Sequence, residues 1–176
     1  MSTRVRGSAH SVAQALQAEK DGVAFFEKAY AVSNDPRVRD VFERLAAAKK
    51  VHLRNLEDGL LELHMATAGE ARHSTAYPFA DILKTECYVC GYGVESGEVP
   101  ESCPRCGASR YAFEKEISLR KAWELAESGS RATLGILADA EKEATPAVRP
   151  IIARQMQLEQ RLLDETRKEL EALREK

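Results

Sequence analysis

Residues 87–113 read CYVCGYGVESGEVPESCPRCGASRYAF, and the interpretation of the whole chain begins with this stretch. It holds all four cysteines of the chain as two C-x2-C pairs separated by twelve residues: Cys87, Cys90, Cys103 and Cys106. Two residues between thiolates let one tight turn present both sulfurs to one ion, and two such turns complete a tetrahedron that suits Zn2+ or a single iron. The spacing therefore predicts a metal site. Two disulfides are the alternative, which a reducing compartment disfavours.

The residues around the cysteines predict a small, turn-rich module. Residues 85–113 are rich in Gly, Pro, Cys and Tyr, a composition that does not support a helix. Such a segment is too small to hold a core without a staple. Gly91 and Gly107 each follow the second cysteine of a pair, where a residue without Cβ relieves backbone crowding and lets amides turn toward sulfur. We expect short strands and turns around one metal ion.

The residues before the module predict two helices. Apolar side chains recur three, four or seven residues apart from about Ser8 to Val32, which is the spacing of one helix face. Asp35 is a suitable N-cap and Pro36 a suitable first residue for a second helix, which extends to about residue 66. These two helices and the connector that follows them form the first expected domain, residues 1–84.

The residues after the module predict two more helices. One extends from about Glu114 to Glu143, and the other from about Pro146 to Glu175. Thr145 and Pro146 repeat the N-cap and first-position pattern of the first half. The expected domains are therefore a helix pair at 1–84, the metal module at 85–113 and a second helix pair at 114–176.

The two helix pairs look like copies of one unit. Shifted by 110 residues, the second helix falls on the last one, and apolar residues match apolar residues. The first and third helices align if the turn is two residues longer in the second half, which places Glu19 opposite Glu127. Chance likeness between two amphipathic helices is the alternative, because patterning alone makes such helices similar. The matched pairs are Val38 and Val148, Val41 and Ile151, Phe42 and Ile152, Leu53 and Leu163, Leu60 and Leu170, and Leu63 and Leu173.

Residues 87–113 resemble the short rubredoxin-like module of rubrerythrins. The likeness rests on CGY after the first cysteine pair, Pro100 before the second, the CPRCG run and the trailing Phe113, and it covers 27 residues. In that family the site holds one iron and passes single electrons. Zinc-ribbon modules use the same ligands for structure alone, so the ligands leave zinc open while the resemblance favours iron.

The flanking helices resemble the ferritin-like four-helix bundle of the same proteins. Rubrerythrins usually carry the module at one end of the bundle, whereas here it lies between the two halves. The expected fold is therefore mainly α, with a ferritin-like four-helix bundle and a small rubredoxin-like β/turn metal module inserted between helices 2 and 3.

The resemblance implies where a second metal centre would lie. Ferritin-like di-iron proteins place one Glu on each of two helices and Glu-x-x-His on each of the other two. The internal repeat locates the lone-Glu positions at Glu19 and Glu127, with Glu124 as an additional candidate. It locates the Glu-x-x-His positions at residues 49–52 and 159–162.

Each of these last two positions lacks one ligand. Lys49 stands where a Glu is expected before His52, and Leu162 stands where a His is expected after Glu159. A Lys ammonium repels a metal ion, so we expect the di-iron site to be absent or incomplete. We also expect Lys49 to pair inside the bundle with some of the three glutamates, because buried carboxylates need such a partner.

Ordinary structural roles are the alternatives for these residues. In a chain with 31% charged residues, Glu19, Glu127 and Glu159 could each lie at the surface. His52 could be a hydrogen-bonded core histidine. A literal Glu-x-x-His occurs at residues 70–73, in the Gly-containing connector, where we do not expect a metal site.

Composition limits the other classes of function. The net charge is −2, which predicts no nucleic-acid partner. No apolar run reaches the roughly 18 residues of a membrane span, and the N-terminal residues lack the apolar core of a signal peptide, so we expect a cytoplasmic protein away from membranes. No G-x-S-x-G motif or Gly-rich phosphate loop occurs, so no catalytic residue and no organic cofactor site are predicted.

Two functions remain open at this point. One is a rubrerythrin-like redox protein that transfers single electrons through iron, in peroxide or oxidative-stress defence if a second centre survives. The other is a non-enzymatic metal-binding or structural protein, with zinc in the four-cysteine ribbon and a helical dimer scaffold. Whether the chain is an enzyme depends on that second centre. The resemblance implies a redox partner protein and a homodimer.

Overall fold

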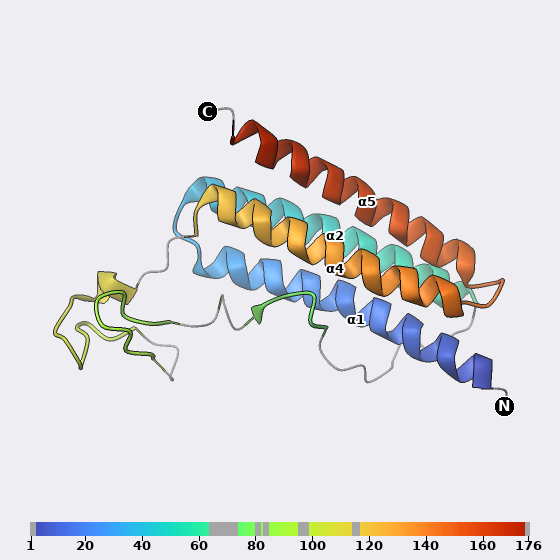
Figure 1. Cartoon of the computed structure of the whole chain (residues 1–176), viewed down its shortest axis with the longest axis horizontal. Coiled ribbons are helices and arrows are strands. Elements are labelled where there is room, and N and C mark those ends of the chain that lie inside the picture. Colours follow the sequence, from blue (N-terminus) through green and yellow to red (C-terminus); the bar gives the residue numbers. More distant parts are fainter. Residues whose placement is uncertain are drawn as a thin grey trace.

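The computed structural model describes residues 3–63, 74–79, 82, 85–94, 99–113 and 117–174, with the backbone alone for residues 3–9. Four long helices form a bundle in which each half of the chain contributes an antiparallel pair (Figure 1). The module follows the second helix and precedes the third, as expected. The helices are α1 (Thr3–Val32), α2 (Pro36–Glu62), α4 (Leu119–Glu143) and α5 (Arg149–Ala172).

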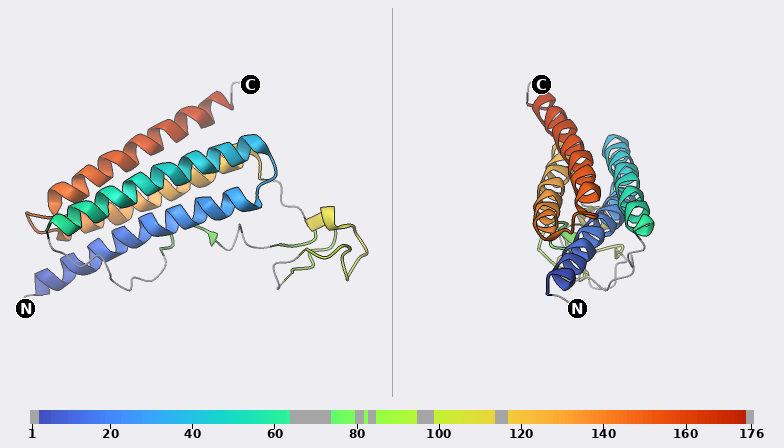
Figure 2. Two further views of the ribbon diagram at one scale, coloured as in Figure 1. Left: turned by 180° about the vertical axis from the view of Figure 1, so that it is seen from behind. Right: turned by 90° about the vertical axis from the view of Figure 1, so that its right-hand side faces the viewer.

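The connection between the two halves is a long crossover. The chain leaves α2 at one end of the bundle and enters α4 at the other, so α2 and α4 run in the same direction (Figures 1 and 2). Residues 74–79 of the connector lie along the bundle on the way to the module (Figure 1). A crossover of this kind is one of the established ways to connect a four-helix bundle.

The start of α2 confirms the sequence prediction. Asp35 is the N-cap, and its Oδ1 accepts a hydrogen bond of 2.9 Å from the backbone amide of Arg37. Pro36 is the first helical residue, where its missing N–H group costs nothing.

The starts of α4 and α5 were predicted too early. Helix α4 begins at Leu119, with Ser118 as the N-cap, whose hydroxyl accepts from the amide of Lys121 at 3.1 Å. Helix α5 begins at Arg149, and no side chain caps it. The Thr145 carbonyl instead accepts from the amide of Arg149 at 3.0 Å, so residues 146–148 form a turn before the helix. The Asp35–Pro36 pattern is thus not repeated in the second half.

The bundle interior has two apolar regions with a polar layer between them. One region gathers aromatic residues such as Phe25, Phe26 and Phe42 together with Trp123. The other is built from smaller aliphatic residues toward the opposite end of the helices. Each helix contributes buried polar residues between the two regions: Glu19, Lys49, His52, Ser130, Thr133, Gln155 and Glu159. This layer coincides with the positions at which the resemblance implied metal ligands.

The metal module lies beyond one end of the bundle (Figure 1). Its own small core consists of Cys87, Cys103 and Phe113. The expected short strands are replaced, within the described residues, by isolated bridges that pair Glu86 with Gly93 and Ser102 with Ser109. A short 3-10 helix, η1 (Arg110–Phe113), closes the module.

Buried residues on both sides attach the module to the bundle. Ile82 before it and Ile117 after it belong to the aromatic half of the bundle core. Among the described helices, none is long and apolar enough to cross a membrane.

Candidate metal centre and buried polar cluster

The structure brings the four cysteines into one group. Cys87 Sγ lies 3.7 Å from Cys106 Sγ, and Cys90 Sγ lies 3.6 Å from Cys103 Sγ. All four sulfurs lie within 4.8 Å of one another, and the cysteines are free. One metal ion bound to four sulfurs at about 2.3 Å would hold them about 3.8 Å apart along the edges of a tetrahedron. The sulfur positions therefore fit a single tetrahedral metal ion.

The two cysteine pairs adopt the same local structure. The amide of Gly91 donates to the Cys87 carbonyl at 2.7 Å, and the amide of Gly107 donates to the Cys103 carbonyl at 2.8 Å. Both glycines have positive φ, 71° and 75°, a conformation that other residues rarely adopt. This confirms the expected role of the two glycines, which turn the chain so that both sulfurs of a pair face the same point.

Backbone amides and burial give the thiols different pKa values. Burial raises the pKa of Cys90 to about 12. Burial also acts on Cys103, but the amides of Cys106 and Arg105 donate toward its sulfur and lower its pKa to about 7. Sulfurs this close repel one another when charged, so a bound cation is what would let all four ionise together. The donor set thus suits a metal that prefers thiolate.

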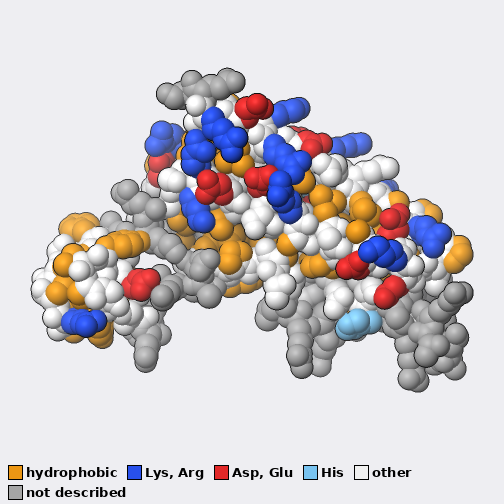
Figure 3. All heavy atoms as spheres, viewed as in Figure 1, with side chains coloured by type: hydrophobic (Ala, Val, Ile, Leu, Met, Phe, Trp, Pro, Cys, Tyr) orange, Lys and Arg blue, Asp and Glu red, His pale blue; other side chains and the backbone are white. Residues whose placement is uncertain are grey.

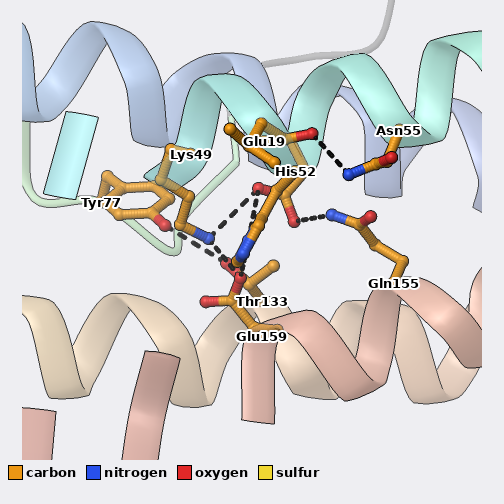
Figure 4. Close-up of polar contacts among 9 residues, drawn as sticks. Glu19, Lys49, His52, Asn55, Tyr77, Thr133, Gln155 and Glu159 are labelled. Carbon is orange, nitrogen blue, oxygen red and sulfur yellow. Dashed lines mark hydrogen bonds and ion pairs between the residues drawn. The ribbon is translucent and has the colours of Figure 1, made fainter. Parts of the chain in front are cut away.

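The second predicted site is a buried polar cluster built around Lys49 (Figure 4). Lys49 Nζ donates to Glu159 Oε2 at 2.7 Å and to Glu19 Oε2 at 3.2 Å. All three side chains are fully buried. The expectation that Lys49 pairs with glutamates inside the bundle is confirmed for these two residues.

Two further side chains complete the hydrogen bonding of the glutamates. His52 Nδ1 lies 3.0 Å from Glu159 Oε2, so His52 is a hydrogen-bonded core histidine in this arrangement. Gln155 Nε2 donates to Glu19 Oε1 at 2.8 Å. Glu159 Oε1 is buried without a hydrogen-bond partner in the described structure.

The ionisation of the cluster follows from burial and from Lys49. Burial alone would favour the neutral amine, but Glu19 and Glu159 hold the pKa of Lys49 well above its ordinary value. Burial also disfavours the charged form of Glu159, yet Lys49 and His52 lower its pKa to about 2. The pKa of Glu19 is raised, mainly by burial and further by Glu159, while Lys49 opposes the shift. A charged Lys49–Glu159 pair is therefore the stable centre of the cluster.

The same residues include a group with the spacing of a metal site. Glu19, His52 and Glu159 each present a ligand atom, and these atoms lie within 4.8 Å of one another. The Lys49 ammonium lies among them, within hydrogen-bond distance of both carboxylates. It supplies the positive charge that a metal ion would otherwise bring to the carboxylates.

Glu127 is not part of this cluster, contrary to the expectation from the repeat. Its carboxylate lies 3.1 Å from Arg167 Nε and 3.2 Å from an Arg131 guanidinium nitrogen, near the surface. Ala126, one residue earlier, is buried instead. A shift of one residue turns a helical side chain by about 100°, which is enough to move a carboxylate out of the bundle. Glu124 is also exposed, and residues 70–73 lie outside the described residues.

Tyr77 is a member of the cluster region that the sequence analysis missed. It belongs to the connector, and its hydroxyl lies 3.4 Å from Thr133 Oγ1 (Figure 4). The Lys49 ammonium lies 5.7 Å from the centre of its ring. Burial raises the pKa of Tyr77 to about 12, so the phenol stays neutral. A single aromatic residue in a connector has no periodicity that could reveal its burial.

Gln155 was also missed, although the sequence contains a usable signal. It lies four residues before Glu159, so both residues share one face of α5. The repeat gives no hint, because its counterpart by the shift of 110 residues is the apolar Leu45.

Comparison with known proteins agrees with the geometry of the module. Residues 86–114 match the family model described as "Rubrerythrin, rubredoxin-like domain". Comparison with curated proteins gave no match, and comparison with solved structures gave none either. The match covers the four cysteines and leaves the bundle helices outside it. The inserted module is therefore a rubredoxin-like domain of the rubrerythrin type, within a four-helix protein.

Proposed function

We propose that the protein is a one-electron carrier whose rubredoxin-like domain holds a single iron. The observation that carries the proposal is the spacing of the four sulfurs, 3.6 and 3.7 Å across the two measured pairs, within a domain that matches the rubrerythrin type. Cys87, Cys90, Cys103 and Cys106 would hold the iron, and iron bound by four thiolates takes up and releases one electron.

The surface of the module supports exchange of the electron with another protein. Tyr88, Val89 and Tyr111 are exposed large side chains, and the face of the module in Figure 3 carries few charges. Cys106 is exposed as well, so the sulfur cage reaches the surface. Apolar surface of this kind is typical of protein contacts. We therefore propose a redox partner protein that docks at the module.

The buried cluster argues for a carrier over a peroxidase. Peroxide reduction of the kind implied by the resemblance needs a second metal centre in the bundle. Lys49 brings an ammonium to the carboxylates that would hold it. Any role in peroxide or oxidative-stress defence would then belong to the partner that receives the electron. A homodimer and a cytoplasmic location stay predictions, and light scattering tests the first.

Metal analysis combined with absorption spectroscopy tests this function. Protein produced in iron-rich medium is expected to contain a single iron per chain, with a visible thiolate-to-iron band that bleaches on reduction and returns on oxidation. Cys90→Ala should lose the band, and Lys49→Met should keep it. Zinc in the site, with no reversible bleaching after iron loading, would overturn the proposal in favour of a structural module. Additional iron that remains in the Cys90→Ala variant would point to a second centre in the bundle.

A further inference from the structure

A groove opens between α2, α4 and α5 on the side of the bundle away from the buried cluster's carboxylates. Helix α5 diverges from α2 and α4 toward its C-terminal end, which leaves room between the helices (Figures 1 and 2). The groove has a volume of about 230 Å³. Apolar side chains show between charged ones over α4 and α5 (Figure 3). The lining residues that matter here are Leu45, Ala48, Trp123, Leu162 and Thr166.

The lining contains a buried hydroxyl that has no hydrogen-bond partner. Thr166 is fully buried, and its Oγ1 forms no hydrogen bond within the described structure. Such a group usually finds a partner, because an unpaired buried hydroxyl costs free energy. The neighbouring walls, Leu45, Leu162 and Trp123, are apolar. The groove thus combines an apolar lining with one polar group that a ligand could satisfy.

The charges at the rim of the groove balance. Arg44 and Lys168 carry positive charge, and Glu165 and Glu169 carry negative charge. The Arg44 guanidinium lies 5.8 Å from the centre of the Trp123 ring, so it covers one part of the opening. With two charges of each sign, the rim favours neither an anion nor a cation. A neutral ligand fits this arrangement best.

We propose that the groove binds a small neutral aromatic molecule that carries one hydrogen-bonding group. The ring would lie among Trp123, Leu45 and Leu162, and its polar group would pair with Thr166 Oγ1. The volume suits this class, because an engineered apolar cavity of about 150 Å³ binds benzene and the groove is somewhat larger. Long side chains such as Arg44 and Lys168 would swing aside to admit the ring. The proposal is independent of the metal in the module.

Binding of phenol and toluene to the full-length protein tests the proposal. The two probes share a ring, and only phenol can hydrogen-bond to Thr166. The protein is loaded with zinc, which is colourless, so that the emission of Trp123, the single tryptophan of the chain, reports binding directly. We expect both probes to change this emission in a saturable way, with phenol bound more tightly.

Three variants locate the binding. Thr166→Val should weaken phenol about five-fold, the effect of losing one neutral hydrogen bond, and leave toluene unchanged. Ala48→Leu fills the groove and should abolish binding of both probes, whereas Ala47→Leu, at the exposed neighbouring position, should not. The proposal is overturned if neither probe saturates, if Thr166→Val binds phenol as the wild type does, or if Ala48→Leu keeps wild-type affinity.

Discussion

At the scale of single residues, Lys49 determines what the bundle interior can do. Its ammonium lies between two buried carboxylates and hydrogen-bonds to both, at 2.7 and 3.2 Å. A buried ion pair adds little net stability over an apolar pair of the same shape, but removal of one member leaves an uncompensated charge. The cluster is therefore sensitive to the loss of Lys49 in particular.

Substitution of Lys49 by Met should destabilise the protein strongly. Met has a similar length and cannot neutralise Glu19 or Glu159, so the expected loss is about 3–5 kcal/mol in the free energy of unfolding. The matched control is Lys50→Met, because Lys50 forms a 2.6 Å pair with Glu27 in which both side chains are more than half exposed. That pair should contribute less than about 1 kcal/mol. Urea unfolding measures both, and equal losses would contradict a central role for Lys49.

The pH dependence of stability should carry the signature of Glu159. Its pKa falls from 4.5 to about 2 in the folded protein, chiefly because Lys49 opposes the effect of burial. A carboxyl with a lowered folded-state pKa stabilises the protein fully above its unfolded pKa, and this contribution is lost as the pH falls toward the folded value.

Comparison with Glu159→Gln isolates this contribution. The difference in unfolding free energy between the wild type and Glu159→Gln should shrink as the pH falls from about 5 toward 2. Metal loss at low pH affects both proteins and largely cancels in the difference. A difference that stays constant over this range would show that Glu159 is not held ionised by Lys49.

The sequence could predict half of this site at residue level. The shift of 110 residues correctly placed Lys49 opposite Glu159, because α2 and α5 present matching apolar faces. The alignment of α1 with α4 allowed a two-residue longer turn and placed Glu127 inward by mistake. The glycines that approach Tyr77, Gly22 and Gly129, are 107 residues apart, a shift that pairs Glu19 with the buried Ala126 instead. Side-chain direction changes with every residue of a helix, so small alignment errors move ligands out of a site.

At the scale of elements, the connector is fastened to the bundle by Tyr77. Its ring packs against Phe25 and Phe26, with ring centres 5.4 and 5.7 Å apart. Both α1 and α4 carry a glycine where they face it: a Cβ on Gly22 would lie 2.7 Å from the Tyr77 hydroxyl oxygen, and one on Gly129 would lie 2.5 Å from a ring carbon. The two glycines therefore make the space that the tyrosine fills.

Two glycine substitutions within α4 should have opposite effects. Gly129→Ala forces a methyl group against Tyr77, and overpacking of this kind costs about 1–3 kcal/mol. Gly135→Ala is the control, because a Cβ at Gly135 meets nothing within 4 Å. Alanine favours the helix over glycine there by up to about 1 kcal/mol. Thermal unfolding distinguishes them, and similar melting temperatures would show that Tyr77 is not held against α4.

Helix boundaries show what the sequence could and could not give at this scale. The cap at Asp35 was predictable, because its side chain accepts from a local amide. Thr145 and Pro146 look similar in sequence, but there the Thr145 carbonyl, and not its side chain, accepts from the start of α5. A backbone carbonyl can play this part at any residue type, so composition does not reveal it.

At the scale of the whole molecule, the module and the bundle have separate cores. The core of the module contains two of its own metal ligands, Cys87 and Cys103, together with Phe113. The bundle core is far larger and contains no cysteine. Folding of the module therefore depends on the metal, whereas folding of the bundle does not.

Removal of the metal by a chelator should affect only the module. Trypsin is expected to cleave the chelated protein after Arg105 or Arg110, which lie within the module, and to cleave the metal-loaded protein there much more slowly. The far-ultraviolet circular dichroism of the four helices should change little. Loss of most of the helical signal on chelation would contradict the independence of the two parts.

The lysine inside the bundle has a further consequence for the life of the protein in a cell. A cation carried by a side chain is made with the polypeptide, so its supply does not vary with nutrition and it cannot be exchanged for the wrong element. It also has one valence, so the bundle holds its charge through every cycle of oxidation and reduction at the module. A cell short of metal would therefore still accumulate a folded scaffold, ready to be loaded at the four cysteines when metal returns.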